Sequence, residues 1–468
     1  MFNDLWYTTA LDLATHYEAK RVSPVETVTA ILERIERLNP VLNCFCYLDR
    51  TDVLDTAKRS EERWRKGEPL GPLDGVPVSI KDLLLTKGWP TLCGSLTVDP
   101  AGPWDEDDPA VARLREVGAV LLGKVTTPEF GNSGITDSPL TGVTVNPWDI
   151  RRTTGGSSGG SVAAVAAGLG PLSIGTDTGG SIRTPSSFCG LVGLKPTFGR
   201  VAQYPETDWG GISVSGPIAR TVSDAALLMT VIAQPDARDG KCLPRDGHDY
   251  LAASEGGITG WRVAFSPDLG FMPVDPEIAA LVRTAAKCFE ELGAHVDEVP
   301  PLFEDPIHIF NTIWSPIIAT GLKARFSEEQ LTKLGHETRD ALEETKGISL
   351  DTFVEAERQR DLLAHTMRRF HDNYDLLLTP TSIVVPFETT HAMPPEWDTE
   401  RAWVWELPTF PFNFSRQPAV TVPCGFTATG LPVGLQIVGP VYEDARVLRA
   451  ARTYQEAYPT TDRRPPLD

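Results

Sequence analysis

Apolar positions along this chain recur with helical spacing in some segments and form short continuous runs in others. The segment that begins SPVE at residue 23 combines an N-cap serine, a proline at the first helical position and a glutamate two residues later. Apolar residues at helical spacing follow, so this segment predicts a helix. Residues 76–80 form a short apolar run, which predicts a buried strand that ends at Lys81 and Asp82.

The same two patterns alternate through the rest of the chain. Helices are predicted for residues 108–118, 221–233 and 275–293, with a last one from about Glu443. Strands are predicted for residues 119–124, 261–265, 295–299, 376–380, 419–423 and 433–439. Residues 300–372 have a mostly helical pattern, and residues 385–412 are rich in proline, tryptophan and phenylalanine. Alternation of helices and strands indicates an α/β fold.

The number of domains is decided by composition rather than by length. A chain of 468 residues is long enough for two or three domains. No stretch has the composition of a linker, however, and no segment is repeated. We therefore expect one large domain with a helical insertion.

The net charge and the absence of targeting signals limit which partners and which cellular compartment we expect. The formal net charge of -20 repels phosphate backbones, which argues against nucleic acid as a partner. The N-terminus lacks the basic and apolar regions of a signal peptide, and no run approaches the roughly 18 apolar residues that cross a membrane. Seven scattered cysteines, an odd number, favour reduced thiols. We therefore expect a cytoplasmic protein without a membrane partner.

Metal-binding patterns are missing from the sequence. Cys44 and Cys46 form a single Cys-x-Cys pair with no second pair at metal-site spacing, and the eight histidines show no His-Glu-x-x-His motif. We expect neither a metal nor a cofactor.

Small residues dominate the segment from residue 152 to residue 198. A glycine- and serine-rich linker stays polar, whereas here residues 162–167 and 191–194 are apolar. We therefore expect backbones to pack closely inside a core in this region.

Two serines in this segment, Ser157 and Ser181, follow pairs of glycines. Such glycines let several amide N–H groups converge without interference from side chains, as the binding of an oxyanion requires. A serine hydroxyl is a weak nucleophile and needs a base. With no metal and no obvious histidine partner, Lys81 is the best-placed candidate, because burial at the end of an apolar strand lowers the pKa of a lysine.

Taken together, these motifs resemble the amidase signature family. The similarity rests on the block from Gly155 to Thr197 and on the sequence GVPVSIKD at residues 75–82. It extends over most of the chain, through NPW at 146–148, GP at 216–217, ARTV at 219–222 and the closing PAVTVPCGF and GLPVGLQIVG segments. The resemblance implies an α/β fold with a large central mixed sheet flanked by helices on both faces. It also implies an amidase domain over residues 1–468, with a catalytic core at 70–240, a substrate-lining insertion at 300–412 and a return to the sheet at 413–468.

The resemblance assigns a role to each motif residue. Ser181 is the expected nucleophile, Ser157 a proton-relaying serine after a cis peptide bond, and Lys81 the base. Other expected roles fall on three groups of residues: an oxyanion hole formed by the amides of Thr178, Gly179, Gly180 and Ser181; supporting contacts from Ser158, Asp177 and Arg183; and an acyl pocket at Gly131, Asn132 and Gly134.

Two other functions remain open from the sequence. The run GGSSG also fits the Gly-x-Ser-x-Gly turn of α/β-hydrolases, which would make Ser157 the nucleophile of an esterase with a downstream aspartate and His391. That interpretation does not explain the TDTGGS segment at residues 176–181, and it assigns no catalytic role to Lys81. The other alternative is an amidotransferase subunit that acts with partner chains. Two segments depart from the sequence features of the tRNA-dependent amidotransferase subunit: VTTPEFG after Lys124 and YPETDWGGISVS before Gly216.

The substrate is the least determined part of the prediction. Small-molecule amides, esters and carbamates all remain open, as do a monomer and a homodimer. Aromatic residues could form an apolar wall of the pocket or belong to the core: Trp209, Trp314, Trp403, Trp405 and Phe410. Thr126 stands where relatives often carry asparagine, which leaves the local hydrogen bonding near the pocket open.

Overall fold

The computed structural model describes residues 4–205, 210–395 and 404–467. Within them, eleven strands form one sheet in the order β1-β3-β2-β6-β8-β7-β12-β13-β11-β9-β10, and β4 and β5 form a separate pair. The strands are β1 (Phe45–Tyr47), β2 (Pro77–Lys81), β3 (Val120–Val125), β4 (Val145–Asn146), β5 (Asp149–Thr153), β6 (Leu172–Asp177), β7 (Val192–Lys195), β8 (Val214–Ala219), β9 (Arg262–Phe265), β10 (His295–Glu298), β11 (Leu376–Pro380), β12 (Ala419–Phe426) and β13 (Pro432–Val438).

The large sheet is mixed, as predicted. Strand β2 runs parallel to β3 and β6, and β9 runs parallel to β10 and β11. The remaining neighbours are antiparallel. Among the strands that were predicted, β12 differs most in its bounds, because it continues three residues past Pro423. A bulge between Pro423 and Gly425 lets its pairing with β13 resume there.

Helices cover both faces of the sheet. The α-helices are α1 (Ala10–Glu18), α2 (Pro24–Leu42), α3 (Arg50–Lys66), α4 (Pro109–Glu116), α5 (Gly159–Ala166), α6 (Arg183–Cys189), α7 (Val222–Ile232), α8 (Tyr250–Ala253), α9 (Pro276–Glu291), α10 (Ile307–Arg325), α11 (Glu328–Leu331), α12 (His336–Glu344), α13 (Leu350–Phe370), α14 (Pro411–Phe414) and α15 (Asp444–Ala457). Leu121 and Leu122 are adjacent in β3 but belong to different hydrophobic clusters, one with α4, α7 and α15 and the other with α2, α3 and α5. The predicted fold class is therefore confirmed.

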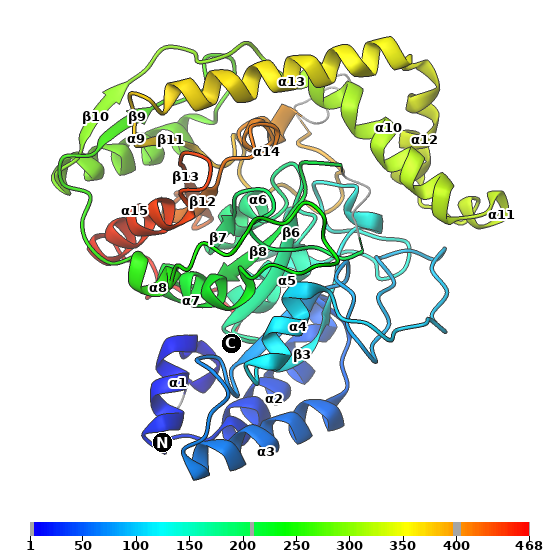
Figure 1. The fold of residues 1–468 in the computed structure, drawn as a ribbon, viewed down its shortest axis with the longest axis vertical. Coiled ribbons are helices and arrows are strands. Elements are labelled where there is room, and N and C mark those ends of the chain that lie inside the picture. The colour runs from blue at the N-terminus through cyan, green and yellow to red at the C-terminus, as the bar shows by residue number, and fades with distance from the viewer. Residues whose placement is uncertain (1–3, 206–209, 396–403, 468) are drawn as a thin grey trace.

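The predicted helices also form. Helix α2 has the expected capping box, in which the Ser23 hydroxyl accepts from the Glu26 amide and the Glu26 carboxylate accepts from the Ser23 amide. The mostly helical pattern of residues 300–372 corresponds to α10, α11, α12 and α13. These four helices lie at the opposite end of the molecule from α1, α2 and α3 (Figure 1). No described helix is long and apolar enough to cross a membrane.

Candidate active site

Lys81 ends strand β2 in the middle of the fold, with no exposed surface. Its Nζ atom has three hydroxyl neighbours: Ser157 Oγ at 2.7 Å, Ser158 Oγ at 3.0 Å and Thr176 Oγ1 at 2.8 Å. Burial lowers the pKa of Lys81 well below the ordinary value for lysine, and the charge of Asp177 opposes this shift without cancelling it. The amine therefore loses its proton more easily than an exposed lysine.

The hydroxyl network around Lys81 fixes the direction of one hydrogen bond. The Ser158 hydroxyl donates to the carbonyl of Thr176 at 3.1 Å, so it must accept from the lysine. A neutral amine has two N–H donors and one lone pair. It can donate to Ser158 and Thr176 and still accept a proton from Ser157, which has no other hydrogen-bond partner among the described residues.

Ser157 lies two residues before the first residue of helix α5, after a cis peptide bond to Gly156. Gly156 packs directly on the backbone of residue 135, since a Cβ atom there would lie 2.7 Å from the Ile135 carbonyl. The amide of the following residue, Ser158, donates to the Ser181 carbonyl at 3.2 Å. This bond joins the loops that carry the two serines of interest.

Residues 178–181, between β6 and α6, present four consecutive amide groups. In the part of the chain that the structure describes, none of the N–H groups of Thr178, Gly179, Gly180 and Ser181 donates a hydrogen bond. All four residues are buried. Buried N–H groups are rarely left unpaired, so a run of four indicates a place kept for an acceptor that is not part of the chain.

Asp177 and Arg183 hold the two ends of this loop together. Their side chains form two hydrogen bonds, at 2.9 and 3.0 Å, and neither side chain has exposed surface. Although burial opposes ionisation, the Arg183 guanidinium lowers the pKa of Asp177 to about 2. Asp177 also accepts from the Ile182 amide at 3.1 Å. The pair thus fixes the turn that precedes α6.

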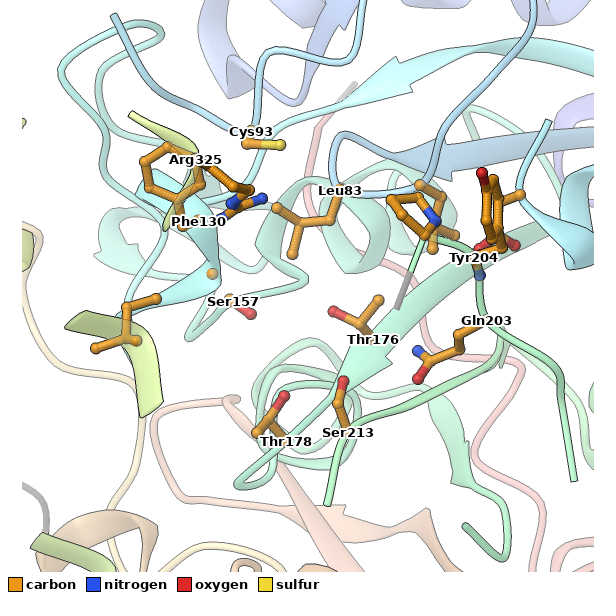
Figure 2. Close-up of a pocket in the computed structure, with 15 residues that line it drawn as sticks. Leu83, Cys93, Phe130, Ser157, Thr176, Thr178, Gln203, Tyr204, Ser213 and Arg325 are labelled. Carbon is orange, nitrogen blue, oxygen red and sulfur yellow. The ribbon is translucent and has the colours of Figure 1, made fainter. Parts of the chain in front are cut away.

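A cavity of about 100 Å³ opens onto Ser157. Figure 2 shows Ser157, Thr176 and Thr178 around its centre, with Phe130, Cys93 and Arg325 at one end and Gln203 and Tyr204 at the other. The lining residues are Leu83, Leu84, Cys93, Asp108, Phe130, Gly131, Ser157, Thr176, Thr178, Gln203, Tyr204, Pro205, Ser213, Ile318 and Arg325. A small organic molecule that enters this cavity meets the hydroxyl bonded to Lys81.

The three residues expected in the acyl pocket have different positions. Gly131 lines the cavity, and a Cβ atom there would lie 3.3 Å from Ser157 Oγ. The Asn132 side chain accepts a hydrogen bond from the indole of Trp314 at 2.8 Å and is not among the cavity-lining residues. Gly134 packs against Trp405, where a Cβ atom would lie 2.4 Å from the indole.

The aromatic residues considered for the pocket wall belong to the core where they are described. Trp314, Trp405 and Phe410 are at most 7% exposed and share one hydrophobic cluster, and none of them lines the cavity. Trp209 and Trp403 lie outside the described residues.

Thr126 and His391, the other residues raised by the sequence, have no hydrogen bond to the hydroxyl network among the described residues. Thr126 is buried and shares a 2.6 Å hydrogen bond with Thr144. His391 is exposed and lines a different cavity, beside Val385 and Pro394. Ser157 is therefore bonded to a lysine and has no hydrogen bond to a histidine among the described residues.

Sequence reasoning missed three polar residues around the site. Thr176 precedes Asp177 in a recognisable motif, but a threonine in a strand carries no signal of its own. Thr409 and Asn413 bond to the loop after β6 from more than 200 residues away in the sequence. The structure also contains no group of three or more potential metal-ligating side chains among the residues it describes.

Comparisons with known proteins show which family has this sequence and fold. The family described as Amidase matches residues 26–448. The chain is 38% identical over 474 residues to an acylamidase of Rhodococcus erythropolis, covering 99% of this chain and 98% of that protein. It is 36% identical over 489 residues to a glutamyl-tRNA(Gln) amidotransferase subunit of Chloroflexus aggregans, covering 99% of both. The crystal structure of a bacterial aryl acylamidase of the amidase signature family matches with a TM-score of 0.91 and 30% identity over 97% of each chain.

The fold, the buried lysine with its serine partner and these similarities define the class of protein. The chain belongs to the amidase signature family. It is a hydrolase that acts on amide carbon–nitrogen bonds.

Proposed function

We propose that this protein hydrolyses small carboxylic amides through an acyl-enzyme on Ser181, with Ser157 as proton relay and Lys81 as base. One observation carries the proposal: a fully buried amine whose three hydrogen-bond partners are hydroxyls and not carboxylates. Without a carboxylate partner, the charged form of a buried lysine is disfavoured. The neutral amine is the form that can accept a proton.

In the first half of the reaction, Ser181 Oγ attacks the amide carbonyl carbon. Its proton moves to Ser157 Oγ, and the Ser157 proton moves to Lys81 Nζ along the 2.7 Å contact. Negative charge develops on the substrate oxygen, where the unpaired N–H groups of residues 178–181 stabilise it. The C–N bond then breaks, and the proton returns from Lys81 through Ser157 to the leaving amine.

In the second half, water attacks the ester formed on Ser181. Its proton follows the same relay to Lys81, and the second tetrahedral intermediate uses the same N–H groups. Breakage of the Ser181 ester bond gives the carboxylic acid, and the relay returns the proton to Ser181. Ser158 supports the relay through its bond to Lys81, while Asp177 and Arg183 hold the loop.

The proposed division of the chain follows these roles. Residues 70–240 contain every proposed catalytic group, residues 300–412 contribute to the substrate side, and residues 413–468 return to the sheet. Gly131 from the catalytic core and Ile318 from the insertion both line the cavity. The seven cysteines form no disulfide in the structure, which supports a cytoplasmic location.

Similarity alone leaves a second function open, because the amidotransferase subunit is nearly as similar to this chain as the acylamidase. The match to the aryl acylamidase structure supports the amidase. The test is to incubate the purified chain alone with matched chromogenic anilides, esters and carbamates. We expect release of the aniline without any added protein, and loss of that release in Ser181→Ala. If the purified chain hydrolyses none of these substrates until partner chains are added, the result would favour the amidotransferase function.

A further inference from the structure

Two carbonyl groups, one at the end of β6 and one in the loop that follows, accept hydrogen bonds from side chains in a distant part of the chain. The Thr409 hydroxyl donates to the Gly179 carbonyl at 2.6 Å, across 230 residues of sequence. The Asn413 amide donates to the Asp177 carbonyl at 3.1 Å, across 236 residues. The Thr409 hydroxyl also lies 2.9 Å from the Glu406 carbonyl, but that carbonyl already accepts from the Thr409 backbone amide at 3.1 Å. We therefore assign the hydroxyl proton of Thr409 to the shorter contact, with the Gly179 carbonyl.

These two bonds determine which way the loop amides point. The cis peptide bonds of the described chain are at Gly102-Pro103, Gly156-Ser157 and Tyr204-Pro205, so the peptides after Asp177 and Gly179 are trans. In a trans peptide the C=O and N–H groups point in opposite directions. A carbonyl held toward Thr409 therefore turns the N–H of Gly180 away from Thr409, and a carbonyl held toward Asn413 does the same for Thr178.

We propose that Thr409 and Asn413 are positioning residues for the oxyanion site, because they fix the orientation of the peptides that donate to it. This inference rests on the proposed function. Neither residue lines the cavity that opens onto Ser157. Thr409 fixes the Gly179–Gly180 peptide, and Asn413 fixes the Asp177–Thr178 peptide. The bond from the Thr184 amide to the Gly180 carbonyl, at 2.8 Å, orients the Ser181 N–H in the same way from within the loop's own helix.

The packing at Gly180 supports a role for Thr409 in particular. Gly180 has a φ of +140°, and a Cβ atom there would lie 2.2 Å from Thr409 Oγ1. The hydroxyl therefore lies directly against the peptide that it orients. Thr409 itself has no exposed surface, so water cannot replace a lost hydroxyl without a rearrangement.

The experiment compares Thr409→Val, which removes the hydroxyl at nearly constant volume, with Thr409→Ser, which keeps it. We expect the valine variant to lose about 100-fold in kcat, the effect of one misplaced oxyanion donor, with KM changed less than about 3-fold. The serine variant should stay within a few-fold of the parent protein. Thr381→Val is the matched control, because Thr381 is equally buried and its hydroxyl bonds to Thr421 at 2.6 Å, away from the site. It should keep the parent kcat.

A second measurement separates positioning from general structural damage. Affinity for a trifluoromethyl ketone, which forms an oxyanion on the nucleophilic serine, should fall in Thr409→Val in parallel with kcat/KM. Affinity for the carboxylic acid product should change little. If the valine variant does not melt cooperatively, Thr409→Ala is used for the same comparison.

The outcomes distinguish this proposal from the function on which it rests. An inactive Ser181→Ala together with a Thr409→Val that keeps its kcat and its ketone affinity would overturn the positioning role alone. An active Ser181→Ala would overturn the proposed function itself.

Discussion

The Nζ atom of Lys81 lies 2.7 Å from the Oγ atom of Ser157, and neither side chain is appreciably exposed to solvent. The two residues are 76 positions apart, one at the end of β2 and the other just before α5. Because the amine has only hydroxyl partners, its protonation state depends on burial and on the more distant charge of Asp177. The pH of the solution therefore determines what fraction of Lys81 is neutral and able to act as the base.

The first prediction is that activity rises with pH along a limb set by Lys81. The base must be neutral. Activity is therefore lost as the pH falls through the pKa of Lys81, and it reaches its full value above that pKa. Burial lowers that pKa, so the limb should lie well below the pKa of about 10.4 of a free lysine. The measurement is kcat/KM for an anilide against pH.

The control for this prediction is Lys81→Arg. A guanidinium stays protonated throughout the accessible pH range and cannot accept the Ser157 proton. We expect a loss of several orders of magnitude in kcat/KM and no ascending limb. An arginine variant with near-normal rates and an unchanged profile would show that Lys81 is structural.

The second prediction concerns the buried pair of Asp177 and Arg183. Arg183→Met leaves the Asp177 carboxylate buried without its cation, and the free energy of unfolding should fall by about 3–5 kcal/mol. Urea unfolding followed by circular dichroism measures this. Arg151→Met is the matched control, since Arg151 pairs with Asp149 at the same 2.9 Å but is 80% exposed, and it should change stability little. Equal effects of the two substitutions would contradict the assigned importance of the buried pair.

The third prediction is that catalysis is independent of metal ions. The proposed reaction uses only Lys81, the two serines and backbone N–H groups. Dialysis against EDTA should therefore leave kcat unchanged. Loss of activity that added zinc or manganese restores would contradict the mechanism.

Sequence patterns predicted those parts of the fold whose signals are local. The capping box of α2 and the apolar run of β2 have characteristic residues at fixed spacing. Helix α2 begins at Pro24 as predicted, and β2 formed within one residue of its predicted bounds. Strands β6 and β8 were not predicted, because glycine, serine and threonine interrupt their apolar pattern. In the structure these residues pair as antiparallel neighbours in the centre of the sheet.

The candidate site was predictable only as far as its motifs reach. Lys81, Ser157 and Ser181 stand in recognisable segments, so their selection needed no coordinates. Thr409 and Asn413 could not be found in this way, because their contacts with the loop after β6 exist only once distant segments pack together. The family resemblance assigns Asn132 to the acyl pocket. Its local sequence does not indicate that its side chain bonds to Trp314.

The most direct test of the central claim is to find which serine becomes acylated. The purified protein is treated with a fluorophosphonate, digested, and analysed by peptide mass spectrometry. We expect the label on Ser181, with Ser157 unmodified, and no labelling of Ser181 in the Lys81→Arg variant on the same timescale. A label on Ser157 with Ser181 unmodified would contradict the account and support the esterase alternative.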